Sequence, residues 1–381
     1  MNNLIYLDYA ATTPVAPEVA KLMAEYLTLG GCFANPASRS HMAGWQAEQA
    51  VEKARQQVAY LIGSDVREIV WTSGATEANN LAIIGAARAN PDKGRHIITS
   101  AIEHKAVLDT CHWLEKDGYT ITRLQPNAQG QITVEQVAAA LTPDTFMVSL
   151  MLVNNELGTV NPVTEIGELL KNHSALFHVD AAQAAGKLPI DVNQLKVDLL
   201  SLSGHKFYGP KGVGALYVRR QPAVHLEAII HGGGHERGMR SGTLPTHQLV
   251  GIGLAAAMAA AQIADDKQHV SQCCAAFLQQ LNPNLYVQTA ANLTNWPGIV
   301  NLAFPNVEAE TLMMALPDLA VSTGSACNAA SIDPSYVLVA LGLNRATALS
   351  SIRFSFGRYL TLAQANFAGQ QVNQALERLK N

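Results

Sequence analysis

Several features that mark specialised classes of protein are scarce in this sequence. Only 15% of its 381 residues are charged, and neither a short repeat nor a low-complexity block runs through its 28 glycines and 16 prolines. These shortages exclude a repeat protein, a fibrous protein and a disordered chain. Because 48% of the residues are hydrophobic, the chain has enough apolar material for one large or two moderate packed domains.

Cysteine is also scarce, and its spacing is uninformative for metals. The five cysteines form an odd set without the CxxC spacing of a zinc site; they are Cys32, Cys111, Cys273, Cys274 and Cys327. Neither a disulfide framework nor a structural zinc site is therefore predicted, and we expect reduced thiols.

A strong net charge is lacking too. The formal net charge of -4 gives no global electrostatic reason to bind nucleic acid or an anionic membrane. The N-terminus lacks the pattern of a signal peptide, and we expect no run to approach the ~18 uncharged residues that a membrane span requires. The prediction is a cytoplasmic protein that acts on small molecules.

What the sequence does contain is an alternation of short apolar runs and helical patterns from about residue 65 to about 220. This alternation predicts an α/β fold with a mostly parallel sheet. An alanine-rich helical stretch follows from about residue 250, and it favours a second, smaller domain with which the first 15 residues could pack. The expected strands are 68–72, 96–99, 147–153, 176–179, 199–201 and 214–218 in the first part, with others near 298–304 and 352–356.

Polar residues follow these strands, where ligands of parallel sheets bind. One such segment, Thr72 to Glu77, places Gly74, Ala75 and Thr76 at the start of a helix. Their unpaired backbone N–H groups and the helix dipole suit a phosphate. An ordinary Ser/Thr helix cap explains the same residues equally well.

A carboxylate, Asp180, follows the apolar run 175–179. A buried carboxylate needs a cationic or hydrogen-bonding partner, and a pyridinium nitrogen would serve. Gln183, three residues later, is placed to reach the same ligand. A helix N-cap is an equally good interpretation of Asp180.

An amine, Lys206, ends the segment Ser203-Gly-His-Lys. In a partly desolvated crevice at a strand end it could form a Schiff base. A lone lysine is usually a solvated surface charge. Here Ser203 and His205 resemble phosphate donors, which favours the cofactor interpretation.

Two other histidines, His231 and His235, have a four-residue spacing, but the three glycines between them oppose a helix. Metal binding is therefore not expected.

A thiol and a guanidinium complete the candidate set. Cys327 lies in a run of small and polar residues, 322–331, which predicts an exposed and mobile position. Cys111, Cys273 and Cys274 lie in helical patterns and suit a buried position instead. Arg353 alternates with the apolar Ile352 and Phe354, so it faces the opposite side of its strand. It could pair with a substrate carboxylate or form a structural ion pair.

Together these residues resemble the housekeeping cysteine desulfurases of bacterial iron–sulfur cluster assembly, a branch of the class-V aminotransferases. The resemblance spans nearly the whole chain. It rests on the segments 203–206, 178–180 and 324–327, and also on 7–14, 35–38, 72–77, 154–156, 231–236 and 240–243.

The resemblance implies a pyridoxal-phosphate fold of type I, with a mostly parallel seven-stranded sheet in a large domain (16–250). It implies a smaller α+β domain (1–15 and 251–381) that carries a mobile cysteine loop at about 322–333, and a homodimer. By this resemblance, the cofactor phosphate would contact Ala75, Thr76, Ser203, His205 and the opposite subunit's Thr243. The cofactor ring would contact His104, Asp180, Gln183 and Lys206. The substrate would bind to Asn155, Arg353 and Asn35, and Asn155 would also lie near the cofactor.

The implied reaction converts L-cysteine to L-alanine and leaves a persulfide on Cys327, with Lys206 moving a proton and His104 assisting as acid or base. The persulfide would pass to iron–sulfur scaffold proteins and to tRNA thiolation. Docking of a scaffold is less certain because the chain stops 54 residues after Cys327 (381 minus 327). The alternatives are a selenocysteine lyase, another class-V enzyme, or a sulfur-carrier interaction protein without turnover.

Overall fold

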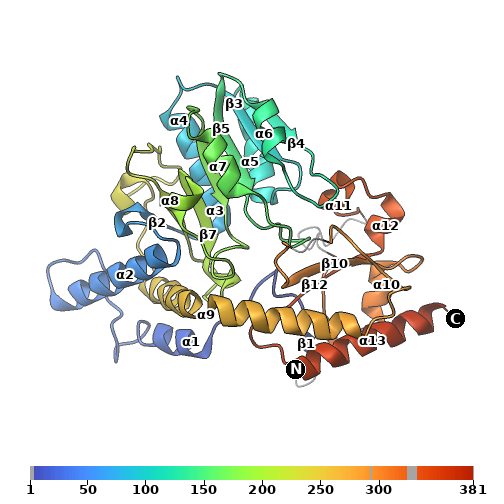
Figure 1. The fold of residues 1–381 in the computed structure, drawn as a ribbon. Coiled ribbons are helices and arrows are strands. Elements are labelled where there is room, and N and C mark those ends of the chain that lie inside the picture. Colours follow the sequence, from blue (N-terminus) through green and yellow to red (C-terminus); the bar gives the residue numbers. More distant parts are fainter. Residues whose placement is uncertain (1–3, 292–293, 324–332, 381) are drawn as a thin grey trace.

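The computed structural model describes residues 4–291, 294–323 and 333–380 (Figure 1). Its largest sheet has seven strands. Strands β3 to β7 run parallel, and β8 runs antiparallel to both of its neighbours. The expected mostly parallel sheet is confirmed. In spatial order its strands are β2 (Ile69–Thr72), β8 (Gly214–Val218), β7 (Leu199–Ser203), β6 (Leu176–Asp180), β5 (Thr145–Met151), β3 (His96–Ser100) and β4 (Thr120–Leu124).

Two smaller sheets are built mainly from the C-terminal part. The strands expected near 298–304 and 352–356 are β10 (Ile299–Ala303) and β12 (Ser351–Ser355), which pair antiparallel, and β9 (Val287–Gln288) completes the sheet. Near the N-terminus, β1 (Ile5–Tyr6) pairs parallel with β11 (Leu319–Ala320). The N-terminal strand therefore packs against the C-terminal part of the chain.

Helices surround the sheets (Figure 1). A π-helical turn, Leu81–Gly85, joins two of them, α3 and α4. The helices are α1 (Pro17–Ala24), α2 (Met42–Leu61), α3 (Ala75–Asn80), α4 (Ala86–Ala89), α5 (Lys105–Lys116), α6 (Val134–Ala140), α7 (Val163–Leu170), α8 (Val192–Leu195), α9 (Thr246–Gln279), α10 (Ala309–Met314), α11 (Tyr336–Ala340), α12 (Arg345–Leu349) and α13 (Leu362–Lys380).

The large sheet has an apolar core on each face, because successive side chains of a strand point to opposite sides. In β2, Ile69 and Trp71 join the larger core and Val70 joins the smaller one. The larger core continues into the C-terminal sheet through Leu302 and Phe354. Both faces being covered explains why the central strands read as continuous apolar runs rather than as alternating ones.

The long helix α9 corrects one expectation from the sequence. By length and composition alone it could cross a membrane, so the expectation that no run approaches that length is wrong. The core helix of a folded protein passes the same test, and α9 packs against α1, α2 and α13. Figure 1 shows it running beneath the large sheet and toward α13.

Strand β5 lies two residues before its expected position of 147–153. The chain leaves the sheet because the side-chain oxygen of Asn154 accepts hydrogen bonds from the backbone N–H groups of Glu156 (2.9 Å) and Leu157 (3.0 Å). This turn directs Asn155 and Glu156 toward the carboxyl edge of the sheet.

Candidate active site

A cavity of about 790 Å³ opens beyond the carboxyl ends of the parallel strands, where ligands of such sheets bind. Ten of the residues predicted from the sequence line it: Ala75, Thr76, His104, Asn155, Asp180, Gln183, Ser203, His205, Lys206 and Arg353. They come from segments up to 278 positions apart (353 minus 75). The fold brings these predicted residues to one place.

Lys206 ends the short 3-10 turn that follows β7. Its amine donates hydrogen bonds to the backbone carbonyls of Ala10 (2.7 Å) and Ala11 (2.9 Å). The lysine is thus held inside the cavity by the N-terminal segment, and it is not the solvated surface charge that a lone lysine usually is.

Asp180 ends β6 with only 5% of its surface exposed. One carboxylate oxygen accepts from the side-chain amide of Asn79 (2.7 Å), and the other accepts from the backbone N–H of Ala182 (2.9 Å). The residue therefore makes a capping-type turn and also presents a buried acceptor to the cavity. The helix N-cap interpretation of Asp180 is wrong, because turns follow the strand and the next helix, α8, begins only at Val192.

The side-chain amide of Gln183 connects Lys187 to the Ala10 carbonyl, which also accepts from Lys206. The amide oxygen accepts from the amine of Lys187 (2.6 Å), and the amide nitrogen donates to the carbonyl of Ala10 (2.7 Å). The same carbonyl accepts from Lys206. Lys187 is half-buried, and burial followed by the charges of Lys206 and Arg353 lowers its pKa to about 7.

His104 caps α5. Its Nδ1 accepts from the backbone N–H of Ala106 (3.1 Å), so the ring proton belongs on Nε2. Burial lowers the pKa of His104, an effect that the charge of Asp180 opposes and that of Lys206 reinforces. A neutral imidazole that donates through Nε2 results at neutral pH.

The possible anion site lies where α3 begins. Gly74 has a φ of 151°, a conformation that strongly favours glycine, and α3 starts at the next residue. Ser203 and His205 face the same cavity. Burial, with help from nearby lysines, lowers the pKa of His205 to about 4.

Arg353 is 3% exposed and makes the structural ion pair that the sequence left as an alternative. One terminal nitrogen contacts Asp8 (2.7 Å) and the other donates to the carbonyl of Asn155 (3.0 Å). The guanidinium still lines the cavity. It is therefore braced by Asp8 while facing the position where a carboxylate could bind.

Several residues at this edge had no predicted role. Glu156 lines the cavity, accepts a hydrogen bond from the hydroxyl of Ser335 (2.5 Å), and has its pKa raised by burial to about 7. Glu103 is buried behind His104, and burial raises its pKa to about 8. Their positions directly after strands were a signal, but no pattern in the sequence indicates that Ser335 donates to Glu156 or that Ser100 donates to Glu103. Asn79, inside a helix, offered no signal that distinguishes it from a surface amide.

Two of the predicted residues that the structure describes are not among those that line the cavity. Asn35 is exposed and its side-chain oxygen accepts from the backbone N–H of Ala37 (2.9 Å), and Thr243 is also exposed. Cys327 lies outside the described residues. On either side of it, Ser322 pairs through backbone hydrogen bonds with Arg353, and Tyr336 lines the cavity.

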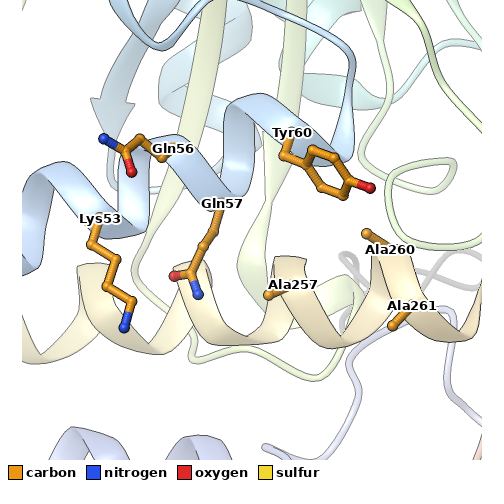
Figure 2. A pocket seen from close by; sticks show the side chains of 7 residues that line it. All are labelled: Lys53, Gln56, Gln57, Tyr60, Ala257, Ala260 and Ala261. Atoms are coloured by element: carbon orange, nitrogen blue, oxygen red, sulfur yellow. The ribbon is translucent and has the colours of Figure 1, made fainter.

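A second hollow, of about 480 Å³, lies between α2 and α9 (Figure 2). Lys53, Gln56, Gln57 and Tyr60 of α2 line it, with Lys53 and Gln57 pointing toward α9, and three alanines of α9 form its other side. Among the described residues that line it, there is one amine and no carboxylate, imidazole or thiol.

Comparisons with known proteins are consistent along nearly the whole chain. Residues 5–366 match the family described as aminotransferase class-V. The chain is 57% identical over 378 residues to "Cysteine desulfurase IscS" of Pseudomonas putida (strain W619), and 56% identical over 377 residues to the protein of that name from Shewanella sp. (strain W3-18-1). Each alignment covers 99% of this chain and 93% of the relative.

Solved structures agree with these relatives. A "NIFS-LIKE PROTEIN" superposes with a TM-score of 0.91 at 33% identity, over 98% of this chain and all of that one. A structure titled "SspA in complex with cysteine" superposes with a TM-score of 0.82 at 40% identity, over 93% of this chain and 99% of that one.

Proposed function

This chain belongs to the class-V aminotransferase family, and to the pyridoxal-phosphate-dependent cysteine desulfurases within it, and we propose that Lys206 holds its cofactor and Cys327 accepts sulfur from L-cysteine. The observation that carries the proposal is the meeting of Lys206, Asp180 and His104 in one cavity. An amine, a buried carboxylate and a neutral imidazole are the groups that such chemistry requires.

The residues present fit pyridoxal phosphate. The buried Asp180 carboxylate, fixed by Asn79 and Ala182, suits a protonated ring nitrogen. Thr76, Ser203 and His205 offer donors to a phosphate at the start of α3, where helix N–H groups also point. Asn155 has a buried side-chain oxygen without a hydrogen-bond partner among the described residues, which is the kind of group that a bound ligand satisfies.

Bound there, pyridoxal phosphate supplies an electron sink that acidifies the α-carbon of an amino acid. Arg353 and Asn155 would hold the substrate carboxylate, with the guanidinium oriented by Asp8. Lys206 would take the α-proton and return it, since its amine lies in the cavity. His104 would assist as an acid or a base through its Nε2 atom.

Sulfur transfer balances without an outside oxidant. The Cys327 thiolate attacks the substrate sulfur, so an S–S bond forms as the C–S bond breaks. The electrons of the broken bond stay with the carbon fragment, which takes up protons and leaves as L-alanine. The protein keeps the sulfur as a persulfide, which we propose it passes to acceptors for iron–sulfur cluster assembly and tRNA thiolation in the cytoplasm.

A homodimer is part of the proposal. Large apolar side chains are exposed along one N-terminal segment: Leu27, Leu29, Phe33, Met42 and Trp45. Burying such side chains against a second copy would be favourable. Asn35 lies in the same segment. Since neither Asn35 nor Thr243 lines the cavity of its own subunit, both proposed roles require a site in the partner subunit.

The direct test incubates the purified protein with pyridoxal phosphate, L-cysteine and a reductant, and measures alanine and sulfide. The wild type should form both in equal amounts. The Cys327→Ala variant should bind the cofactor normally, as judged by its visible absorbance, and should lose turnover. Cys111→Ala, at a fully buried cysteine, is the matched control. Equal turnover by wild type and Cys327→Ala would contradict the assignment of the thiol.

A further inference from the structure

Lys187 is a half-buried lysine that the reaction outlined above does not use. Its amine lies 2.6 Å from the side-chain oxygen of Gln183. The positive charges of Lys206 and Arg353 act on it from nearby and help to lower its pKa. A cation placed close to two others is unfavourable unless a specific contact compensates for it.

The contacts with Ala10 and Lys187 together define which way the Gln183 amide points. When it is protonated, the Lys187 amine can only donate, so the amide atom that faces it is the oxygen. A carbonyl can only accept, so the atom 2.7 Å from the Ala10 carbonyl must be the nitrogen. The two contacts demand the same orientation, and it does not depend on how the amide was first assigned.

This orientation leaves one donor for the cavity. The amide nitrogen carries two N–H groups, of which one is directed to Ala10. Gln183 lines the cavity, so the second N–H is available to an acceptor there. With Lys187 absent, the amide oxygen would lose its partner, and the contact with Ala10 alone would hold the side chain, so the second N–H would no longer be kept in one direction.

We propose that Lys187 is a positioning residue that holds the Gln183 amide with its N–H directed at the ring oxygen of the bound cofactor. The inference rests on the proposed function, because that ring oxygen is the acceptor. Lys187 itself touches neither substrate nor cofactor in this account. It acts through the Gln183 side chain.

The test uses full-length protein and measures cofactor binding and its spectrum rather than turnover. Apo-protein is titrated with pyridoxal phosphate, and the visible circular dichroism of the bound cofactor is recorded. Lys187→Met keeps the length of the side chain and removes the donor. We expect the dissociation constant to rise about tenfold, as for loss of a partner of a buried polar group, and the dichroism to change. Lys187→Arg, which keeps N–H donors, should restore much of both.

The double variant tests whether Lys187 acts through the Gln183 side chain. In a Gln183→Ala background, Lys187→Met should cause no further change in the dissociation constant or the spectrum. Lys196→Met is the matched control, since Lys196 pairs with Glu168 and lines neither the active-site cavity nor the hollow between α2 and α9. It should bind the cofactor as the wild type does. If Lys187→Met proves unfolded in a thermal melt, Gln183→Glu replaces it, because a carboxylate keeps the contact with Lys187 but offers no N–H.

Two results would overturn the inference. One is wild-type binding and dichroism in Lys187→Met, or in Gln183→Glu when that variant is used. The other is an equal effect of Lys187→Met with and without Gln183. If the wild-type protein itself binds no pyridoxal phosphate, the proposed function fails and the inference fails with it, so the two failures are distinguishable.

Discussion

Asp180 combines near-complete burial with a position facing the cavity, so its charge matters to whatever binds there. Replacing it by asparagine keeps the shape and removes the charge. We expect Asp180→Asn to lower the rate of alanine formation about 100-fold, equivalent to about 2.7 kcal/mol, the cost of a lost charge-assisted hydrogen bond. Asp191→Asn, at the cap of α8, should leave the rate unchanged. A similar loss in both variants would mean that Asp180 acts only in folding.

The raised pKa of Glu156 predicts how the stability of the protein depends on pH. Burial raises its pKa from 4.5 to about 7, so the folded state binds its proton more tightly than the unfolded state does. The stabilisation is fully present below about pH 4.5 and is lost as pH rises through about 7. Between pH 5 and pH 8 the melting temperature of the wild type should therefore fall relative to that of Glu156→Gln.

This comparison is made by thermal unfolding of the two proteins across the same buffers. Glu165→Gln, at an exposed position of α7, is the control and should follow the wild type. Parallel curves for wild type and Glu156→Gln would show that Glu156 has an ordinary pKa in the folded protein.

At the scale of elements, α2 and α9 approach so closely that one position requires glycine. A Cβ at Gly253 would lie 2.6 Å from both the Cα and the Cβ of Ala54. Alanine normally stabilises a helix relative to glycine by about 1 kcal/mol. Here we expect Gly253→Ala to destabilise the protein by about 1–3 kcal/mol because the helices must separate.

The matched variant is Gly30→Ala, since a Cβ there meets nothing within 4 Å. It should have a melting temperature equal to or above that of the wild type. A rise in the melting temperature of Gly253→Ala would show that α2 and α9 are less tightly packed than the structure has them.

The elements that the sequence predicted well are those buried on both sides. Strand β8 has the expected bounds, and β6 and β7 differ only at their ends. Strand β4 was missed because it is an edge strand with no fully buried residue, so it carries no apolar run. The two-residue strands β1 and β11 depend on pairing across more than 300 positions, which no local pattern reveals.

The same distinction holds within the site. Lys206, Asp180 and His104 follow predictable strands, so their meeting could be inferred from the rule for parallel sheets. The N-terminal carbonyls that hold Lys206, about 195 positions away in the chain, could not. Lys187 looks like a surface charge in the sequence. Only its burial and its hydrogen bond to Gln183 give it a role.

At the scale of the whole molecule, a shared site between two subunits can be tested by mixing inactive variants. Lys206→Ala removes the proposed cofactor lysine, and Thr243→Asp places a carboxylate where we propose that the partner's phosphate binds. If Thr243 acts across the dimer, a mixed dimer has one complete site. Random mixing of equal amounts should then restore about a quarter of the wild-type sites, since half of the dimers are mixed.

The measurement is alanine formation after the two variants are unfolded and refolded together, with each variant refolded alone as the control. No recovery in the mixture, despite dimers of normal size in sedimentation, would place Thr243 at the site of its own subunit or at none.

The central claim is that sulfur passes from L-cysteine to Cys327, and the most direct measurement is the mass of the protein after a single turnover without reductant. The account predicts that the wild type gains one sulfur atom, that peptide mapping places it on Cys327, and that one alanine is released for each sulfur gained. Sulfur on another cysteine, or alanine release with an unmodified protein, would contradict it.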